Sequence, residues 1–180
     1  MKVIGVVGLP ASGKGEFSRI ALAMGIPVVV MGDVIRAAVE EAGLPPTDRN
    51  LGDTASRIRR EEGMDAIARR TIPFIEAEGS DLVLVDGIRG DAEVETFRQH
   101  FPEFSLIGIC CGFETRVQRL YNRGRSDDPK AQEELHRRDE REISWGLARA
   151  LAQADQTICN EGSMEEFEKA VRNLLESLKR

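Results

Sequence analysis

The fold is decided by residues 2–16, KVIGVVGLPASGKGE, in which an apolar run enters a glycine-rich loop and a helical pattern follows. The loop has the spacing G-x-x-x-x-G-K, and a strand before it with a helix behind it is the context in which this spacing binds phosphate. Glycines let backbone N–H groups face one concavity, and a helix N-terminus adds further N–H groups and a positive dipole end. We therefore predict a phosphate-binding loop, with Lys14 directed at the β and γ phosphates. It consists of Gly8, Leu9, Pro10, Ala11, Ser12, Gly13, Lys14 and Gly15.

Beyond this loop, short β-branched apolar segments alternate with helical patterns. The expected strands cover residues 2–7, 28–30, 82–85, 104–111 and 156–159. The expected helices cover residues 14–24, 34–42, 64–78, 92–99, 114–123, 129–152 and 164–178. Continuous apolar strands are typical of a parallel sheet that is buried on both faces. We predict a three-layer α/β domain around a five-stranded parallel sheet.

The remaining segments and the composition define the overall organisation. One domain is expected over residues 1–180. Residues 47–62 and 121–142 are rich in charge and poor in strand signal, so we expect mobile flaps there.

Charge and hydropathy exclude several classes of partner. The formal net charge of −6 argues against a nucleic acid partner, which would need a basic patch. The longest apolar run, residues 26–31, is too short for a bilayer, and the N-terminus lacks a secretory signal pattern. We therefore expect a cytoplasmic protein without a membrane partner. These patterns specify no oligomeric state.

Two acidic residues are candidates for a magnesium site. Leu82–Asp86 is four apolar residues that end in an aspartate, the Walker B pattern, and such an acid beside the loop can hold Mg²⁺ through water. Gly15 stands where a Ser or Thr hydroxyl usually reaches the metal, and Glu16 follows it. Glu16 has two interpretations: it contacts Mg²⁺, or its carboxylate is simply favoured by the helix dipole.

The loop resembles that of the nucleoside monophosphate kinase branch of the P-loop kinases, in which adenylate kinases have G-x-P-G-x-G-K-G-T. Residues 30–38, VMGDVIRAA, are similar to the T-G-D-x-L-R-A-A stretch of adenylate kinases, whose arginine grips the phosphate of the acceptor nucleotide. The resemblance implies that Asp33 and Arg36 bind the acceptor. The residues alone leave an alternative for each: Asp33 is a helix N-cap, and Arg36 lies on a solvated helix face.

Two further segments extend the resemblance. Asp86–Arg89, DGIR, resembles the D-G-F-P-R of adenylate kinases shortened by one residue, which implies that Arg89 binds the acceptor. Arginines with no acid between them follow at 116, 119, 123 and 125, and like charges on one helix face repel unless an anion is their partner. They resemble the lid of nucleotide kinases, which implies that Arg119, Arg123 and Arg125 stabilise the transferring phosphoryl group. The alternative is a solvated basic helix.

The last motif resembles a second group of kinases. Residues 154–163, ADQTICNEGS, are similar to the A-D-x-x-I-x-N-x-G-S of dephospho-coenzyme A kinases, which implies that Asn160 lies in the turn that flanks the adenine. Asn160 is alternatively an ordinary turn residue. The mixture looks most like archaeal P-loop proteins related to adenylate and cytidylate kinases.

The resemblance implies a P-loop kinase core with the strand order 2-3-1-4-5 and the loop strand central. It also implies an acceptor-side flap at about 33–78 and a small helical lid at about 114–142. The implied activity is that of an ATP- and Mg²⁺-dependent kinase that transfers the γ-phosphoryl group to a nucleotide or nucleotide-like small molecule. Lys14 would act with the lid arginines in catalysis, largely through positioning and charge stabilisation. Dephospho-coenzyme A is the alternative acceptor. A non-catalytic or slow nucleotide-dependent switch is an alternative of another class, favoured by the missing hydroxyl and by Glu16. An RNA-associated ATPase is a third, against which the net acidity weighs.

Overall fold

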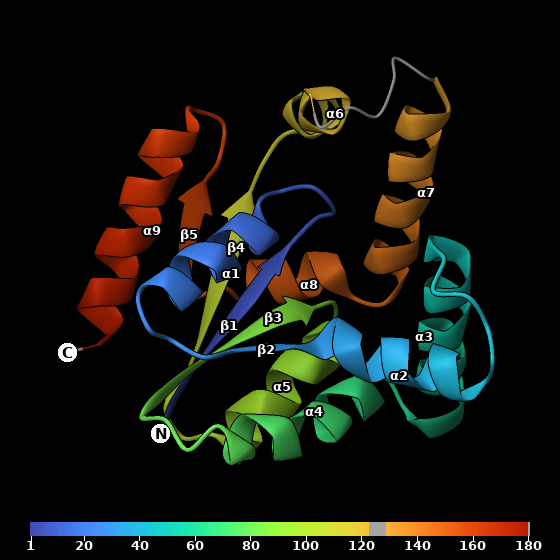
Figure 1. Ribbon diagram of the computed structural model, residues 1–180, viewed down its shortest axis with the longest axis horizontal. Coiled ribbons are helices and arrows are strands. Elements are labelled where there is room, and N and C mark those ends of the chain that lie inside the picture. The colour runs from blue at the N-terminus through green and yellow to red at the C-terminus, as the bar shows by residue number, and fades with distance from the viewer. Residues whose placement is uncertain (123–128, 180) are drawn as a thin grey trace.

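In the computed structural model, which describes residues 1–122 and 129–179, a five-stranded parallel sheet forms the centre of the molecule (Figure 1). The strands are β1 (Lys2–Gly8), β2 (Val28–Val30), β3 (Leu82–Ile88), β4 (Phe104–Cys110) and β5 (Gln156–Cys159). Their order is β2-β3-β1-β4-β5, so the predicted order is confirmed. The register places Val3 of β1 between Val83 of β3 and Phe104 of β4.

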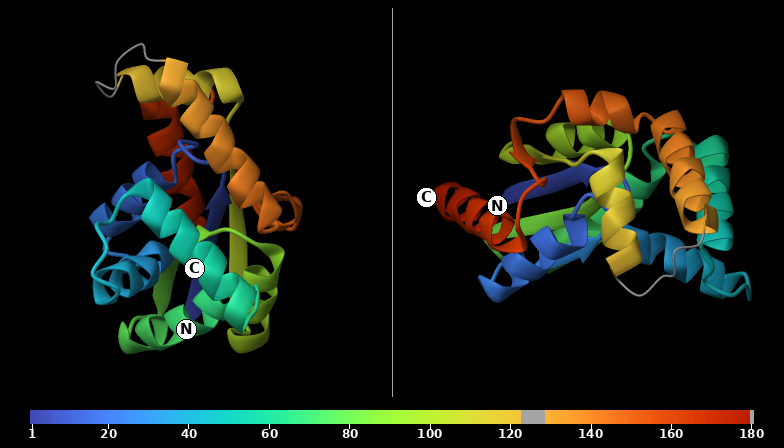
Figure 2. Two further views of the ribbon diagram at one scale, coloured as in Figure 1. Left: turned by 90° about the vertical axis from the view of Figure 1, so that its right-hand side faces the viewer. Right: turned by 90° about the horizontal axis from the view of Figure 1, so that it is seen from above.

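Helices cover both faces of this sheet and one of its edges. They are α1 (Lys14–Ala23), α2 (Met31–Glu41), α3 (Asp48–Glu62), α4 (Ala66–Ala77), α5 (Asp91–His100), α6 (Phe113–Asn122), α7 (Pro129–Ser144), α8 (Leu147–Ala152) and α9 (Met164–Leu178). Figure 2 shows α1 and α9 on one face and α5 and α8 on the other. This is the three-layer α/β architecture that the alternating pattern predicts.

Each face of the sheet has its own apolar core. On β1, Val3 and Val7 pack with Phe97 of α5 and Leu147 of α8 on one side. Ile4 and Val6 face the other core, with Phe17 of α1 and Phe167 of α9. Because side chains alternate across a strand, a strand buried on both faces must be apolar at every position, which explains the unbroken apolar run.

The segments expected as flap and lid fold as helices. Helices α2 and α3 lie beyond the β2 edge, and α6 and α7 arch over the carboxyl ends of the strands (Figure 1). Movement of these segments stays a prediction. None of the helices in the described part of the chain is long and apolar enough to cross a membrane.

Two expectations about this region are wrong. Residues 48–62, expected without helix, form α3, because Leu51, Ala55 and Ile58 recur at helical spacing among the charges and pack into the core. Thr47 caps this helix by accepting a hydrogen bond from the Asn50 N–H at 3.2 Å. The single helix expected over residues 129–152 is two helices, because Gly146 adopts a left-handed φ of 100° between α7 and α8.

Candidate functional site

The loop Gly8–Gly15 connects β1 to α1 at the carboxyl edge of the sheet, as the sequence predicts. No side chain of the described residues caps α1, so its N-terminal N–H groups are available to an anion. Ala11 has a left-handed φ of 60°, an uncommon conformation for a residue with a Cβ and one that functional sites often hold. Gly13 has φ of 116°, and a Cβ there would collide with the Asn160 amide. The loop is thus built to bring backbone close to a ligand.

Lys14 is folded back onto this loop. Its ammonium donates hydrogen bonds to the carbonyl oxygens of Gly8 at 2.5 Å and Leu9 at 3.0 Å, and the side chain is nearly buried. Burial, with the neighbouring Arg89 guanidinium as the second cause, lowers the pKa of Lys14 to about 7. The nearby carboxylates of Glu142 and Asp86 oppose this shift without cancelling it. A polyphosphate bound at the loop would therefore favour the protonated, charged form of Lys14.

Asp86 lies on β3, where the ladder with β1 shifts register just beyond it, and faces the start of α1. Its Oδ2 accepts a hydrogen bond from the Ser18 hydroxyl at 2.8 Å. Ser18 was missed by the sequence analysis, although it stands one helical turn after Lys14 on the same helix face. One carboxylate beside a phosphate loop fits Mg²⁺, which takes most of its other ligands from phosphates and water. Asp86 would hold such an ion, whose charge would offset that of the phosphates.

Glu16, the second predicted metal ligand, has other neighbours. Its Oε1 lies 2.5 Å from Nη2 of Arg19, and Arg19 also approaches Glu168 of α9 at 3.8 Å. This ion pair therefore lies on the side of α1 that packs against α9. Contact of Glu16 with Mg²⁺ stays a prediction.

Asn160 supports the loop from behind. It is buried, its amide donates to the Ser12 carbonyl oxygen at 2.8 Å, and its Oδ1 accepts from Arg119 at 3.0 Å. Arg119 also donates to Cys111 Sγ at 3.3 Å. These contacts place Arg119 close to the loop through Asn160. Direct contact of Asn160 with ATP and of Arg119 with the transferring group stay predictions.

Of the other lid arginines, Arg116 forms a buried link between three segments. Its guanidinium donates to the Pro10 carbonyl oxygen of the loop at 3.0 Å and makes a bidentate pair with Asp139 of α7 at 2.9 and 2.7 Å. Arg116 therefore ties the phosphate loop to α7 rather than being a solvated residue. Arg123 and Arg125, predicted as catalytic, lie outside the described residues.

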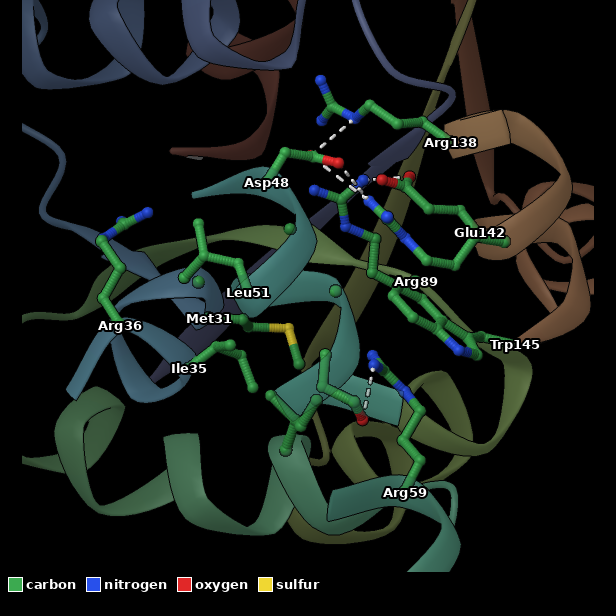
Figure 3. Close-up of a pocket in the computed structure, with 16 residues that line it drawn as sticks. Met31, Ile35, Arg36, Asp48, Leu51, Arg59, Arg89, Arg138, Glu142 and Trp145 are labelled. Carbon is green, nitrogen blue, oxygen red and sulfur yellow. Dashed lines mark hydrogen bonds and ion pairs between the residues drawn. The ribbon is translucent and has the colours of Figure 1, made fainter. Parts of the chain in front are cut away.

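A cavity of about 200 Å³ opens beside the loop, between α2, α3, α7 and the end of β3 (Figure 3). We call this cavity the acceptor pocket. Its apolar wall consists of Met31, Ile35, Leu51, Ala55, Ile67 and Trp145. Its charged wall consists of Arg36, Asp48, Arg59, Arg89, Arg138, Arg141 and Glu142. Five of these seven charged side chains are arginines, so the pocket favours an anion.

The structure brings Arg36 and Arg89 together in this pocket, as the sequence predicts. Arg89 is paired with Glu142 of α7, and Arg36 is paired with Asp33. Asp33 itself does not line the pocket. Its alternative interpretation as an N-cap is wrong, because α2 begins at Met31 and its cap residue is Val30. Contact of Asp33 with an acceptor stays a prediction.

A buried ion pair fixes the direction of Arg89. Glu93 of α5 accepts hydrogen bonds from the backbone N–H groups of Arg89 at 2.7 Å and Gly90 at 3.2 Å, and from Arg59 at 2.6 Å. Both Glu93 and Arg59 are buried, and the Arg59 guanidinium lies over the Trp145 ring at 4.2 Å. Arg59 therefore does not lie on a solvated face of α3, because its partner Glu93 lies on another helix.

The phosphate loop, Gly8–Gly15, and the acceptor pocket are neighbours. The charges that act on Lys14 include Arg89, Glu142 and Arg138, all of which line the pocket. The loop lysine therefore lies next to the arginine-lined wall. The strand order, the loop and this neighbouring pocket together define the class of P-loop kinase domains.

Comparison with known proteins agrees with this class. Residues 7–136 match the AAA_17 family, described as an AAA domain. A UPF0200 protein of Methanoculleus marisnigri is 66% identical over 175 residues, which cover 97% of this chain and 96% of the relative. A UPF0200 protein of Methanoregula boonei is 59% identical over 180 residues, which cover 100% and 99%. The chain belongs to the AAA_17 family of P-loop kinase domains and, within it, to the UPF0200 proteins.

Solved structures share the fold at low sequence identity. The protein TT1252 from Thermus thermophilus has a TM-score of 0.65 at 18% identity and covers 98% of this chain and 97% of its own. A dephospho-CoA kinase from Campylobacter jejuni has a TM-score of 0.59 at 16% identity, covering 99% and 98%. A shikimate kinase from Bacteroides thetaiotaomicron has a TM-score of 0.57 at 16% identity, covering 99% of each chain. These likenesses concern the fold alone.

Proposed function

We propose that the protein transfers the γ-phosphoryl group of ATP, bound with Mg²⁺, to a small molecule in the acceptor pocket. The observation that carries this proposal is the position of Lys14. Its ammonium donates to the Gly8 and Leu9 carbonyl oxygens of the loop. Val7, just before the loop, pairs with Ile88, so Arg89 of the acceptor pocket follows β3 beside the loop. A phosphoryl group held at Lys14 would therefore lie beside the pocket.

The chemistry is a simple displacement. A hydroxyl of the acceptor forms a bond to the γ phosphorus, the bond from that phosphorus to the β–γ bridging oxygen breaks, and ADP leaves with the electron pair. The hydroxyl proton passes to a nearby base or to water. Little covalent chemistry falls to the protein, so its part is positioning and charge stabilisation.

This chain supplies both parts. The loop N–H groups and Lys14 would hold the donor phosphates, and Asp86 would hold the metal. Arg89 lies between loop and pocket, where its guanidinium would meet charge on the transferring group. The structural neighbours support this assignment, since dephospho-CoA kinase and shikimate kinase are kinases of small molecules by name.

The test is acceptor-dependent release of ADP. Purified protein is incubated with ATP, Mg²⁺ and one acceptor at a time, drawn from nucleoside monophosphates, dephospho-coenzyme A, shikimate and sugar acids. The proposal requires that at least one acceptor raises the rate of ADP release well above that without acceptor, and that its phosphorylated product is found by mass spectrometry. Lys14→Met is the inactive control.

A nucleotide-dependent switch is the second candidate. It is favoured by Gly15, which has no hydroxyl for the metal, and by Glu16, whose carboxylate is paired with Arg19. Tight ATP binding with turnover that no acceptor changes would support the switch and contradict the kinase.

A further inference from the structure

We propose that the acceptor is a small acid rather than a nucleotide, and that the Asp48 carboxylate occupies the acid's place on Arg138 and Arg141 until the acid binds. The proposal rests on the proposed phosphoryl transfer, because it names the acceptor class of that reaction. The acid group is a carboxylate or a phosphate on a small carbon frame that also carries a hydroxyl. A nucleotide acceptor, implied by the sequence resemblance, is the competing assignment.

The size of the acceptor pocket is the first argument. Its volume is about 200 Å³, whereas pockets for larger organic ligands span roughly 300–1,000 Å³. A nucleotide carries a base, a sugar and a phosphate, so part of it would extend beyond this cavity. A small hydroxy acid is closer to the cavity in size.

The aromatic residue of the pocket gives the second argument. A protein that binds a nucleobase commonly stacks it on an aromatic face. Trp145 is the aromatic residue that lines the described pocket, and the Arg59 guanidinium already lies over its ring at 4.2 Å. Arg59 is held there by its buried pair with Glu93, so it does not yield the ring to a base. The pocket therefore offers no free platform for one.

The unmet hydrogen bonds of the charged wall give the third argument. Arg138 and Arg141 of α7 share one carboxylate, since each lies 3.2 Å from an oxygen of Asp48. Figure 3 shows Arg138 and Asp48 directed toward each other. Two guanidinium groups carry about ten N–H donors, and one carboxylate has about four acceptor positions. Arg138 makes its ion pair through Nε, whereas the buried Nε of Arg141 makes no hydrogen bond with a described residue. Donors of the two guanidinium groups are therefore left over for a further anionic group.

Asp48 is suited to be displaced. It is the first residue of α3, and its side chain is 38% exposed at the pocket mouth. Partly exposed ion pairs contribute little to stability, so exchanging one carboxylate for another costs little. In contrast, Glu142 is buried against Arg89 and would remain in place. The Arg89–Glu142 pair is therefore fixed and orients Arg89. The arginines paired with Asp48 can instead exchange its carboxylate for the acid group of the ligand.

Binding without turnover tests this directly. Calorimetric titrations use full-length protein with a non-hydrolysable ATP analogue and Mg²⁺. The probes are glycerate, gluconate and shikimate as carboxylates, glycerol 3-phosphate as the phosphate, and AMP and CMP as nucleotides. We expect at least one small acid to bind and both nucleotides to fail to compete with it. The carboxylate and phosphate probes identify the acid group. Binding of AMP or CMP in competition with the acids, or of none of the acids, would overturn the proposal.

Two variants test the exchange itself. Asp48→Asn removes the internal competitor, so the acid should bind about threefold more tightly. Arg141→Met keeps most of the aliphatic stem and removes the charge, so affinity should fall by about tenfold or more. Arg172→Met, which breaks an ion pair with Glu168 on α9, is the matched control and should change nothing. Weaker binding in Asp48→Asn would contradict the exchange, because a merely structural Asp48 predicts a loss.

The experiment also separates this proposal from the proposed function. An acid that binds at the arginines but is never phosphorylated would keep the pocket assignment and refute the kinase. Phosphorylation of AMP or dephospho-coenzyme A would keep the kinase and refute the small acid.

Discussion

The donor loop and the acceptor pocket lie side by side, but they are built in opposite ways. The loop is one contiguous segment, Gly8–Gly15, which presents backbone N–H groups and one lysine. The pocket is assembled from α2, α3, α7 and the end of β3, and its charged wall consists of side chains in ion pairs. A contiguous backbone site survives change elsewhere in the sequence. An assembled side-chain site depends on partners far away along the chain, so it is free to differ between relatives of one fold.

The largest expected effect concerns the donor side alone. Lys14→Met should lower acceptor-dependent turnover by at least about 100-fold, because a charge aimed at the transferring group is lost. Binding of the acceptor, measured by calorimetry, should remain within about twofold of the native value. Lys169→Met, on the exposed side of α9, is the control and should leave turnover unchanged. Loss of acceptor binding in Lys14→Met would show that Lys14 contributes to the acceptor pocket as well as to the phosphate loop.

The next effect concerns the acceptor side and the stability of the fold. Glu93→Gln should lower the free energy of unfolding by about 3 kcal/mol, because Arg59 would stay buried without a charged partner. Glu61→Gln breaks an exposed pair with Arg57 and should cost less than about 1 kcal/mol. Urea unfolding of both variants measures the difference. Equal losses would mean that burial of the Arg59 pair is unimportant.

A third effect depends on pH and belongs to Lys14. Its pKa is about 7 in the folded protein and about 10.5 in the unfolded chain, so between these values the folded state binds fewer protons. The free energy of unfolding should therefore rise as pH increases from 7, by at most about 1.4 kcal/mol per pH unit. Below pH 7 the cost of the buried charge is fully present, and above 10.5 it is absent.

Urea unfolding at pH 7, 8 and 9 measures this slope. Lys14→Met should lack the contribution, and the difference between the two slopes isolates it from other groups. In addition, ATP binding at pH 8 should take up close to one proton, detectable as a dependence of the binding enthalpy on the buffer. Parallel slopes in both proteins would contradict the lowered pKa.

The smallest effect has opposite signs in stability and in binding. Gly52 lies inside α3, so Gly52→Ala should raise the free energy of unfolding by about 0.5–1 kcal/mol. Its new Cβ would lie 2.6 Å from Nη1 of Arg141, the end of a flexible side chain that would move aside. Acid binding should weaken a few-fold for this reason, while ATP affinity, measured on the same variant, should not change. Weakened ATP binding would mean that the pocket wall supports the loop.

The same contrast explains how much the sequence could predict. Five apolar strands and a motif of eight consecutive residues are local patterns, and the parallel sheet and the loop position were predicted from them. The order of the strands was predicted from the resemblance to P-loop kinases. The partners of the arginines were not. Arg138 stands beside Asp139 and Glu140 in the sequence, which indicated a solvated face, yet its partner in the structure is Asp48 of α3. Sequence spacing along one helix carries no information about which other helix faces it.

Asn160 shows the limit of motif resemblance. The motif implied a turn that flanks the adenine, which stays a prediction, and the structure places Asn160 directly after β5, which neighbours β4. It did not predict the contact, which is a hydrogen bond to the Ser12 carbonyl oxygen from behind the loop. Position along a strand follows from pattern, whereas the direction of a side chain follows from packing around it.

Helix α7 contacts both the phosphate loop and the acceptor pocket through residues that are neighbours in the sequence. Asp139 pairs with Arg116, which donates a hydrogen bond to the Pro10 carbonyl oxygen of the loop. Arg138 and Glu142 line the acceptor pocket. A rotation of α7 would change both sets of contacts at once, so we expect nucleotide occupancy to alter acceptor affinity. Thermodynamic linkage would then make the influence mutual: whatever factor the nucleotide imposes on acceptor affinity, the acceptor would impose on nucleotide affinity.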